Sequence, residues 1–188
     1  MTATLTSVAE GILHYGRPSS GVVTERAMVI VHPFFAKKDL KMRKEWQQRT
    51  HRWDPRLELD LKQHENYLAH VKAVIATVNA PVITFEEESR LEKTLLRYRK
   101  YAGEERGDTN WYFIPTKPAD ATPAHPASWD SAIKLIRDLN PRTVFMGGGI
   151  LGNYPGPVDR YTGCLGDTIQ RFASAKIPYR IVPKMTFG

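Results

Sequence analysis

The chain has 188 residues, of which 41% are apolar and 25% are charged, and its formal net charge is +7. This length and composition fit one globular domain with its own core, and the single cysteine excludes internal disulfides and multi-thiolate metal cages. The N-terminal sequence has no basic region followed by a long apolar run, and no apolar run approaches transmembrane length, so we expect a cytoplasmic protein without a membrane anchor.

Residues 1–22 are predicted to be an irregular N-terminal extension, and residues 23–188 a single α/β domain. Within that domain, short runs rich in Val, Ile, Phe and Tyr are bounded by Gly, Pro or Asn, which is the pattern of strands. Their continuous apolarity favours strands that are covered on both faces, as in a parallel sheet. The five predicted strands are 27–35, 81–85, 111–115, 143–149 and 179–183.

Apolar residues at helical spacing separate these strands. The helical stripes begin at Leu61, Leu91, Trp129 and Leu165. Strands that alternate with helices predict βαβ units with right-handed crossovers. The expected fold is therefore a three-layer α/β sandwich with a mostly parallel central sheet and helices on both faces.

Positive charge is concentrated in two segments. Residues 37–52 hold seven Lys or Arg against two acidic residues, and residues 89–101 hold five against one. Such segments attract nucleic acid, phosphorylated ligands or acidic partners, but they are also typical of solvated helix faces. Both interpretations stay open. The aromatic residues among these charges are Trp46, Trp53, Tyr98 and Tyr101.

Chemically active residue types follow several of the predicted strands. Ligands of open parallel sheets bind at the carboxyl ends of the strands. His32 lies near the end of the first strand, and Lys117 follows the third. Each has an ordinary alternative, because a buried histidine often bonds a backbone carbonyl and most loop lysines are solvated. The acidic run 86–88 after the second strand is an acid patch or a solvated turn.

Cys164 lies one residue after Gly163 and directly before the last helical stripe. A helix N-terminus favours a thiolate and hence a nucleophile, whereas cysteine is equally a small residue that packs in cores. The GGG run 147–149 allows close backbone approach but matches no nucleotide-binding fingerprint. Neither a cofactor nor a metal is expected, since the spacing of His51, Asp54 and His64 matches no ligand pattern. Candidate substrate contacts are Gly148, Gly149, Tyr154, Asp159, Arg160, Gly163 and Leu165.

Several short motifs resemble those of the isochorismatase-like cysteine hydrolases. The sequence CLGDT at 164–168 looks like the C-V-x-x-T element of that family, TVFMGG at 143–148 is similar to the strand before it, and IPTKPADATP puts Lys117 where the family lysine stands. AMVIVHPFF looks like the first strand, with His32 at the position of the family aspartate. The resemblance implies a three-layer domain with Cys164 as nucleophile, Lys117 as its cationic partner and His32 as base or orienter.

Three classes of function follow from these features. The first is a hydrolase that uses Cys164 on a small amide or related substrate, with backbone amides from Gly163 to Leu165 holding the oxyanion. The second is a non-enzymatic protein that binds nucleic acid or a phosphorylated ligand through segments 37–52 and 89–101. The third is an assembly role in which the basic face docks an acidic partner. A homo-oligomer is compatible with all three.

Overall fold

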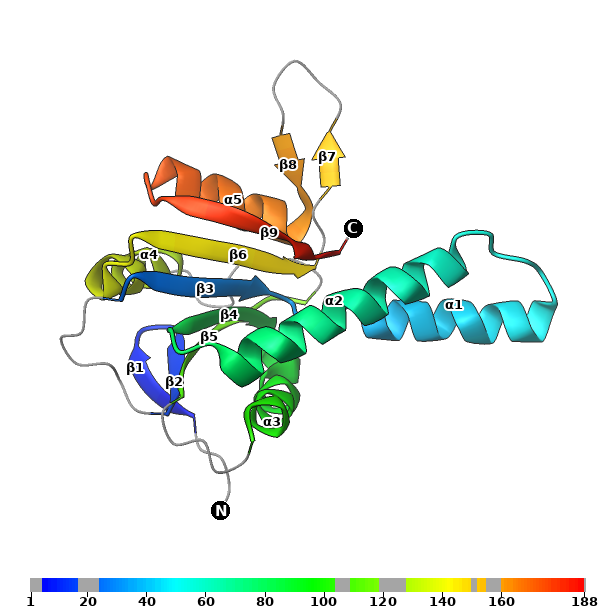
Figure 1. Ribbon diagram of the computed structural model, residues 1–188, viewed down its shortest axis with the longest axis horizontal. Helices are drawn as coiled ribbons and strands as arrows, with labels where there is room; N and C mark the ends of the chain where they lie inside the picture. The colour runs from blue at the N-terminus through cyan, green and yellow to red at the C-terminus, as the bar shows by residue number, and fades with distance from the viewer. Residues whose placement is uncertain are drawn as a thin grey trace.

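A seven-stranded sheet organises the chain, with five α-helices packed around it (Figure 1). The computed structural model describes residues 5–16, 24–103, 109–118, 128–149, 152–154 and 160–187. The helices are α1 Ala36–Thr50, α2 Leu57–Thr77, α3 Leu91–Ala102, α4 Ser128–Leu139 and α5 Gly163–Ser174. The strands of the sheet are β1 Thr6–Ala9, β2 Ile12–Gly16, β3 Arg26–Val31, β4 Val82–Glu87, β5 Asn110–Thr116, β6 Thr143–Gly149 and β9 Tyr179–Phe187.

The inner parallel strands β3, β4, β5 and β6 are largely buried, whereas the edge strand β9 is mostly exposed or half-buried, and this arrangement confirms the predicted α/β fold. Strands β5, β4, β3, β6 and β9 are parallel neighbours in that order. Alternate side chains of β3 point to opposite faces, so that Val29 and Val31 join a core with α4 and α5, whereas Met28 and Ile30 join a core with α2 and α3. This two-sided burial explains why the strands are continuous apolar runs in the sequence.

The sequence predicts an irregular N-terminal segment, but the structure forms two strands, β1 and β2, within it. Strands β1 and β2 form an antiparallel hairpin, and β2 pairs antiparallel with β5. All four residues of β1 are exposed, so this strand has no apolar run for a sequence pattern to detect. The hairpin is attached to the sheet through β2, whose Ile12 is buried in the apolar core and whose His14 Nε2 lies 2.9 Å from Asn110 Oδ1 of β5.

The direction of strand addition reverses at β3. The chain moves from β3 to β4 and β5 on one side, and then returns to place β6 and β9 on the other side. Such a reversal is a topological switch point, and ligands of open α/β sheets bind beside the carboxyl ends of the strands there. Those ends carry His32 after β3 and Gly148 and Gly149 at the end of β6.

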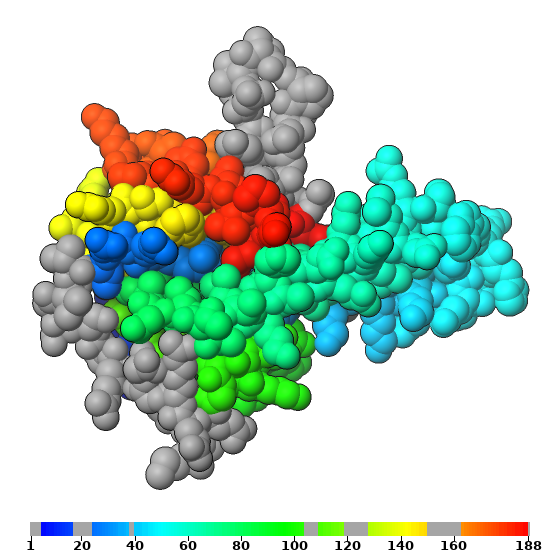
Figure 2. Space-filling model, in the orientation of Figure 1, coloured from blue at the N-terminus to red at the C-terminus, as the bar shows by residue number. Residues whose placement is uncertain are grey.

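The hairpin of α1 and α2 projects from the sheet as an arm (Figures 1 and 2). We call residues 36–61 the arm. Its helices are joined by Arg43, which donates to Asp54 Oδ2 at 2.8 and 3.0 Å and to Asp60 Oδ2 at 2.7 Å. These bonds lower the pKa of Asp54 below its ordinary value. No helix in the described part of the chain has both the length and the apolar character needed to cross a bilayer.

The GGG run at the end of β6 is explained by close packing. A Cβ on Gly147 would lie 2.7 Å from the Met185 Cβ, in a stretch where the β6–β9 register shifts. A Cβ on Gly149 would lie 2.8 Å from the Phe35 ring. Gly148 has φ +132°, and its Cβ would lie 2.0 Å from the carbonyl oxygen of Val31. At Gly148, therefore, only a residue without a side chain fits against the β3 backbone.

We predict that Gly148→Ala destabilises the protein strongly. The disallowed φ alone costs about 1–3 kcal/mol, and the clash with the Val31 backbone adds to that cost. Urea unfolding measures the loss of stability. Gly103→Ala is the matched control, because Gly103 has φ +88° but nothing lies within 4 Å of its added Cβ. Equal stability losses in the two variants would contradict the close approach of β6 to β3.

Candidate functional site

The backbone at the end of β3 is held in an unusual conformation at His32. This residue has φ 44°, in the left-handed region. Its N–H donates to the carbonyl of Phe85 at 2.8 Å, and its carbonyl accepts from the N–H of Phe35 at 3.2 Å. The first bond continues the sheet into β4, while the second closes the turn that leads to α1. Non-glycine residues in this region cost free energy and concentrate at functional sites.

The buried His32 side chain joins two strands that are not neighbours. Its Nε2 lies 3.0 Å from Thr116 Oγ1 at the end of β5, although β4 runs between β3 and β5. Both residues are almost completely buried. A hydroxyl in contact with an imidazole can exchange a proton with it, or be oriented by it. The contact therefore links the switch point at β3 to the carboxyl end of β5, two strands away.

A pocket of about 390 Å³ lies at the carboxyl ends of β4 and β5. Thr116 and Lys117 belong to its wall. The structure therefore places Lys117 in a concave site and puts His32 behind that site, in contact with a wall residue. Sequence reasoning named Lys117 and His32 but gave Ser89 no role, although the strand-end rule covers the turn after β4. The described lining residues are Glu88, Ser89, Thr116, Lys117 and Pro118.

The three adjacent glutamates occupy three different environments. Glu86 is fully buried, and burial raises the pKa of its carboxyl even though Thr94 Oγ1 donates to it at 2.8 Å. Glu87 pairs with Arg90 at 3.0 Å. Glu88 is exposed and lines the pocket. The three carboxylates therefore do not form one acid patch. Glu88 alone has the exposure expected of a solvated turn, and it supplies the carboxylate of the pocket wall.

Cys164 lies in the first turn of α5, as its position before the helical stripe predicts. Its side chain belongs to the apolar core between the sheet and α4 and α5, and the residue is 9% exposed. Its carbonyl accepts a hydrogen bond from Thr168 Oγ1 at 2.9 Å, within the helix. Among the described residues, the lining of the Lys117 pocket does not include Cys164. This environment matches the packing interpretation of the thiol.

The remaining predicted contacts fall into separate places. Gly148 and Gly149 lie against the β3 end, as described above. Gly163 begins α5 with φ 78°, and the side chain of Leu165 is fully buried in the core. Tyr154 and Arg160 are backbone partners in a small antiparallel ladder between β7 Gly152–Tyr154 and β8 Arg160–Thr162. Asp159 lies outside the described residues.

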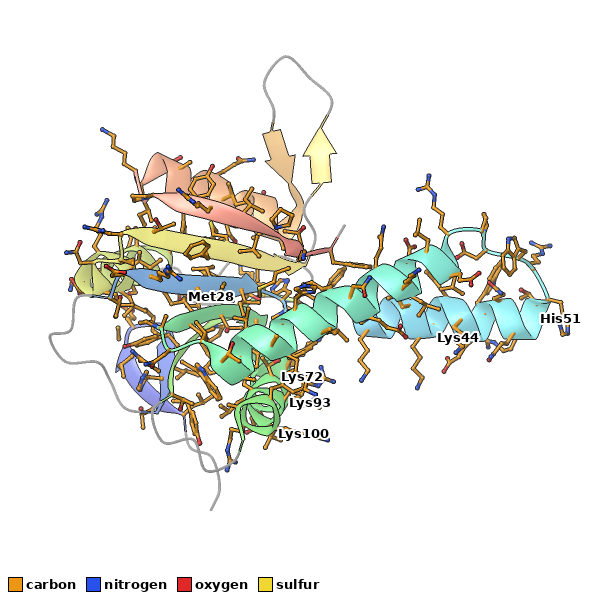
Figure 3. All side chains as sticks on the ribbon, in the orientation of Figure 1. Met28, Lys44, His51, Lys72, Lys93 and Lys100 are labelled. Atoms are coloured by element: carbon orange, nitrogen blue, oxygen red, sulfur yellow. The ribbon has the colours of Figure 1, made fainter. Side chains whose placement is uncertain are left out.

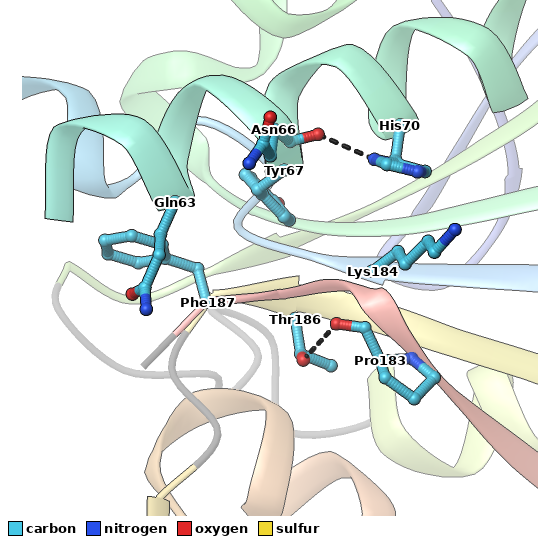
Figure 4. Close-up of a pocket in the computed structure, with 8 residues that line it drawn as sticks. All are labelled: Gln63, Asn66, Tyr67, His70, Pro183, Lys184, Thr186 and Phe187. Atoms are coloured by element: carbon cyan, nitrogen blue, oxygen red, sulfur yellow. Dashed lines mark hydrogen bonds between the residues drawn. The ribbon is translucent and has the colours of Figure 1, made fainter. Parts of the chain in front are cut away.

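A larger groove of about 570 Å³ separates α2 from the irregular part of β9 (Figure 4). Two of its side chains bond to backbone carbonyls within the chain, whereas the buried Tyr67 hydroxyl has no hydrogen-bond partner among the described residues. His70 Nδ1 donates to the Asn66 carbonyl at 2.7 Å, and Thr186 Oγ1 donates to the Pro183 carbonyl at 2.8 Å. Lys184 also lines the groove. The groove is larger than the Lys117 pocket, but the Lys117 pocket lies at the carboxyl ends of parallel strands, where ligands of open α/β sheets bind.

No group of His, Cys, Asp and Glu side chains in the described ranges could hold a metal ion. Asp54, one of the three residues whose spacing was considered above, accepts hydrogen bonds from Arg43. His64 is buried in contact with the Tyr67 and Phe187 rings. Burial lowers the pKa of His64. Asp54 therefore has a structural partner, whereas His64 Nε2 is buried without a hydrogen-bond partner in the described part of the chain.

We predict that the Cys164 thiol is protected from iodoacetamide in the native protein, because it is packed in the core. Mass spectrometry should find the native chain unmodified and the urea-unfolded chain alkylated once, since the sequence has one cysteine. Complete alkylation of the folded protein at the rate of a free thiol would contradict the packing interpretation and support a reactive thiolate.

No protein-family model, curated protein or solved structure matches this chain. The resemblance to the isochorismatase-like hydrolases therefore rests on the short motifs around Cys164 and Lys117, and it stays a prediction.

Proposed function

We propose that this protein binds a small anionic molecule in the pocket at the carboxyl ends of β4 and β5. The observation that carries the proposal is the 3.0 Å contact between His32 Nε2 and Thr116 Oγ1. It connects a conformationally strained residue at the switch point to the wall of the pocket that holds Lys117. Position in the fold and residue chemistry thus point to one place.

The pocket wall offers the groups that an anion needs. The Lys117 ammonium supplies a positive charge, and the hydroxyls of Ser89 and Thr116 are potential hydrogen-bond donors. Ser89 lies in the 3-10 turn Glu88–Arg90, which leads directly into α3. The N-terminus of α3, the positive end of its dipole, therefore begins next to the Ser89 wall of the pocket. Carboxylate and phosphate groups suit this arrangement.

Glu88 sets a second requirement on the ligand. Its carboxylate is an acceptor in the same wall as Lys117. An anion with no hydrogen-bond donor of its own would leave that carboxylate close to like charge, whereas the P–OH group of inorganic phosphate can donate to it. A ligand that carries a hydroxyl or amino group beside its anionic group would satisfy both sides of the pocket. We therefore favour a small hydroxylated or amino-substituted carboxylate or phosphate.

The His32–Thr116 contact fixes the direction of a hydroxyl in the pocket wall. When His32 Nε2 carries a proton, it donates to Thr116 Oγ1 and leaves the threonine proton for another acceptor. When Nε2 is unprotonated, it accepts the threonine proton instead. His32 thus positions the Thr116 hydroxyl. Nucleophilic catalysis by Cys164 is not part of this proposal, because the thiol packs in the core.

We expect inorganic phosphate, used as a probe, to stabilise the folded protein. Phosphate at about ten times its dissociation constant would add about 1.4 kcal/mol of unfolding free energy, which raises Tm by roughly 3–6 °C for a chain of this size. Lys117→Met should abolish this increase because it removes the cation of the pocket. Differential scanning calorimetry in phosphate and in chloride of equal ionic strength measures the effect.

The matched control is Lys134→Met on α4, which removes an exposed lysine from outside the pocket lining. It should keep the full phosphate shift. The proposal fails if phosphate raises Tm no more than chloride does, or if Lys117→Met and Lys134→Met retain the same shift.

A further inference from the structure

The arm carries an unusual concentration of exposed apolar side chains. Met42, Trp46, Trp53 and Leu59 are four of the six large hydrophobic residues that are exposed in the described part of the chain. Trp53 is 69% exposed and Trp46 is 42% exposed. The tryptophans of the sheet body, Trp111 and Trp129, pack instead against aromatic neighbours. Clustered exposed apolar surface marks an interaction site.

The same arm is strongly basic. Arg43 is held inside the hairpin by Asp54 and Asp60, and Lys41 pairs with Glu45. Lys44, Arg49 and Arg52 are exposed and make no ion pair with any residue that the structure describes. Figure 3 shows Lys44 and His51 on this projection, well away from Met28 in the sheet. The arm therefore presents uncompensated positive charge beside its tryptophans.

A pocket of about 250 Å³ between α1 and α2 brings these groups together. Trp53 and Lys44 line it together with the amide side chains of Gln47 and Gln48. Gln47 Oε1 accepts the Asp54 N–H at 3.2 Å, so the Gln47 amide is oriented with its NH₂ group free to donate elsewhere. The other lining residues are Asp54, Leu57, Glu58 and Leu61.

We propose that the arm binds single-stranded nucleic acid, with a base stacked on Trp53 and flanking phosphates contacted by Lys44 and its basic neighbours. An exposed indole, amide hydrogen-bonding groups and unpaired cations are the elements that single-stranded binders combine. A second copy of this chain is a poorer occupant, because both surfaces would carry like charge. A duplex is also poorer, because its stacked bases are not available to an indole.

The test uses the full chain and single-stranded oligo(dT), followed by tryptophan fluorescence quenching and by anisotropy of labelled DNA. Binding should weaken steeply with added salt, because phosphate contacts release counterions. Trp53→Ala should weaken binding by about tenfold or more, since base stacking on an aromatic residue contributes on that scale. Leu59→Ala is the matched control: it truncates another exposed apolar residue of the arm that does not line the pocket.

Charge reversal supplies a second pair of variants. Lys44→Glu should weaken oligo(dT) binding more than Lys72→Glu does, because Lys72 is exposed on the body end of α2 (Figure 3). Lys117→Met should leave the affinity for oligo(dT) unchanged, which separates this proposal from the small-anion site. Calorimetric Tm values check that each variant is folded.

Several outcomes would overturn the proposal. One is an affinity for oligo(dT) that is absent or insensitive to salt. Another is equal weakening by Trp53→Ala and Leu59→Ala. A third is tighter binding to duplex DNA than to oligo(dT). A concentration-dependent dimer that Trp53→Ala dissociates, or binding to anionic phospholipid vesicles without binding to oligo(dT), would assign the arm to those partners instead.

Discussion

The burial of β3 between two parallel neighbours is the constraint on which the rest of the structure depends. This strand bonds to β4 on one side and to β6 on the other, and both of its faces are covered. After β3 the chain turns directly into α1. His32 begins this turn in a left-handed conformation, and its carbonyl accepts the Phe35 N–H. Gly148 lacks a side chain because the Val31 backbone occupies that space.

Two surfaces of different character follow from this exit point. At the sheet edge, His32 reaches across β4 to Thr116, and Lys117 lines a small pocket. Beyond the edge, the chain forms the basic arm, which has exposed tryptophans and the pocket between α1 and α2. The residues that line the two cavities do not overlap. The small-anion site and the arm can therefore be disabled separately, although one turn at His32 connects them.

The sequence predicts the elements whose signals are local. The continuous apolar runs identify the five parallel strands, and the helical stripes identify α2 to α5. The β1–β2 hairpin escapes prediction for two reasons. All residues of β1 are exposed, and β2 joins the sheet by pairing with β5, which is distant in the sequence. The projection of the arm is not predicted either. The charge of residues 37–52 indicates that a helix face is solvated, but it does not indicate that the α1–α2 hairpin extends away from the sheet.

The candidate site divides in the same way. The strand-end rule places His32 and Lys117 at one edge, but the Thr116 contact depends on strand order and on the φ of His32. The sequence left Cys164 open between a thiolate at a helix start and a small residue packed in the core. In the structure Cys164 is buried in α5 together with Thr168 and Phe172, at helical spacing from both.

A two-dimensional ¹H–¹⁵N NMR titration with inorganic phosphate tests most directly whether the sheet edge is a ligand site. The amide signals of Ser89, Thr116 and Lys117 are predicted to shift together and to saturate with one common dissociation constant. Shifts confined to the arm around Lys44, or shifts that never saturate at any of these residues, would contradict the account.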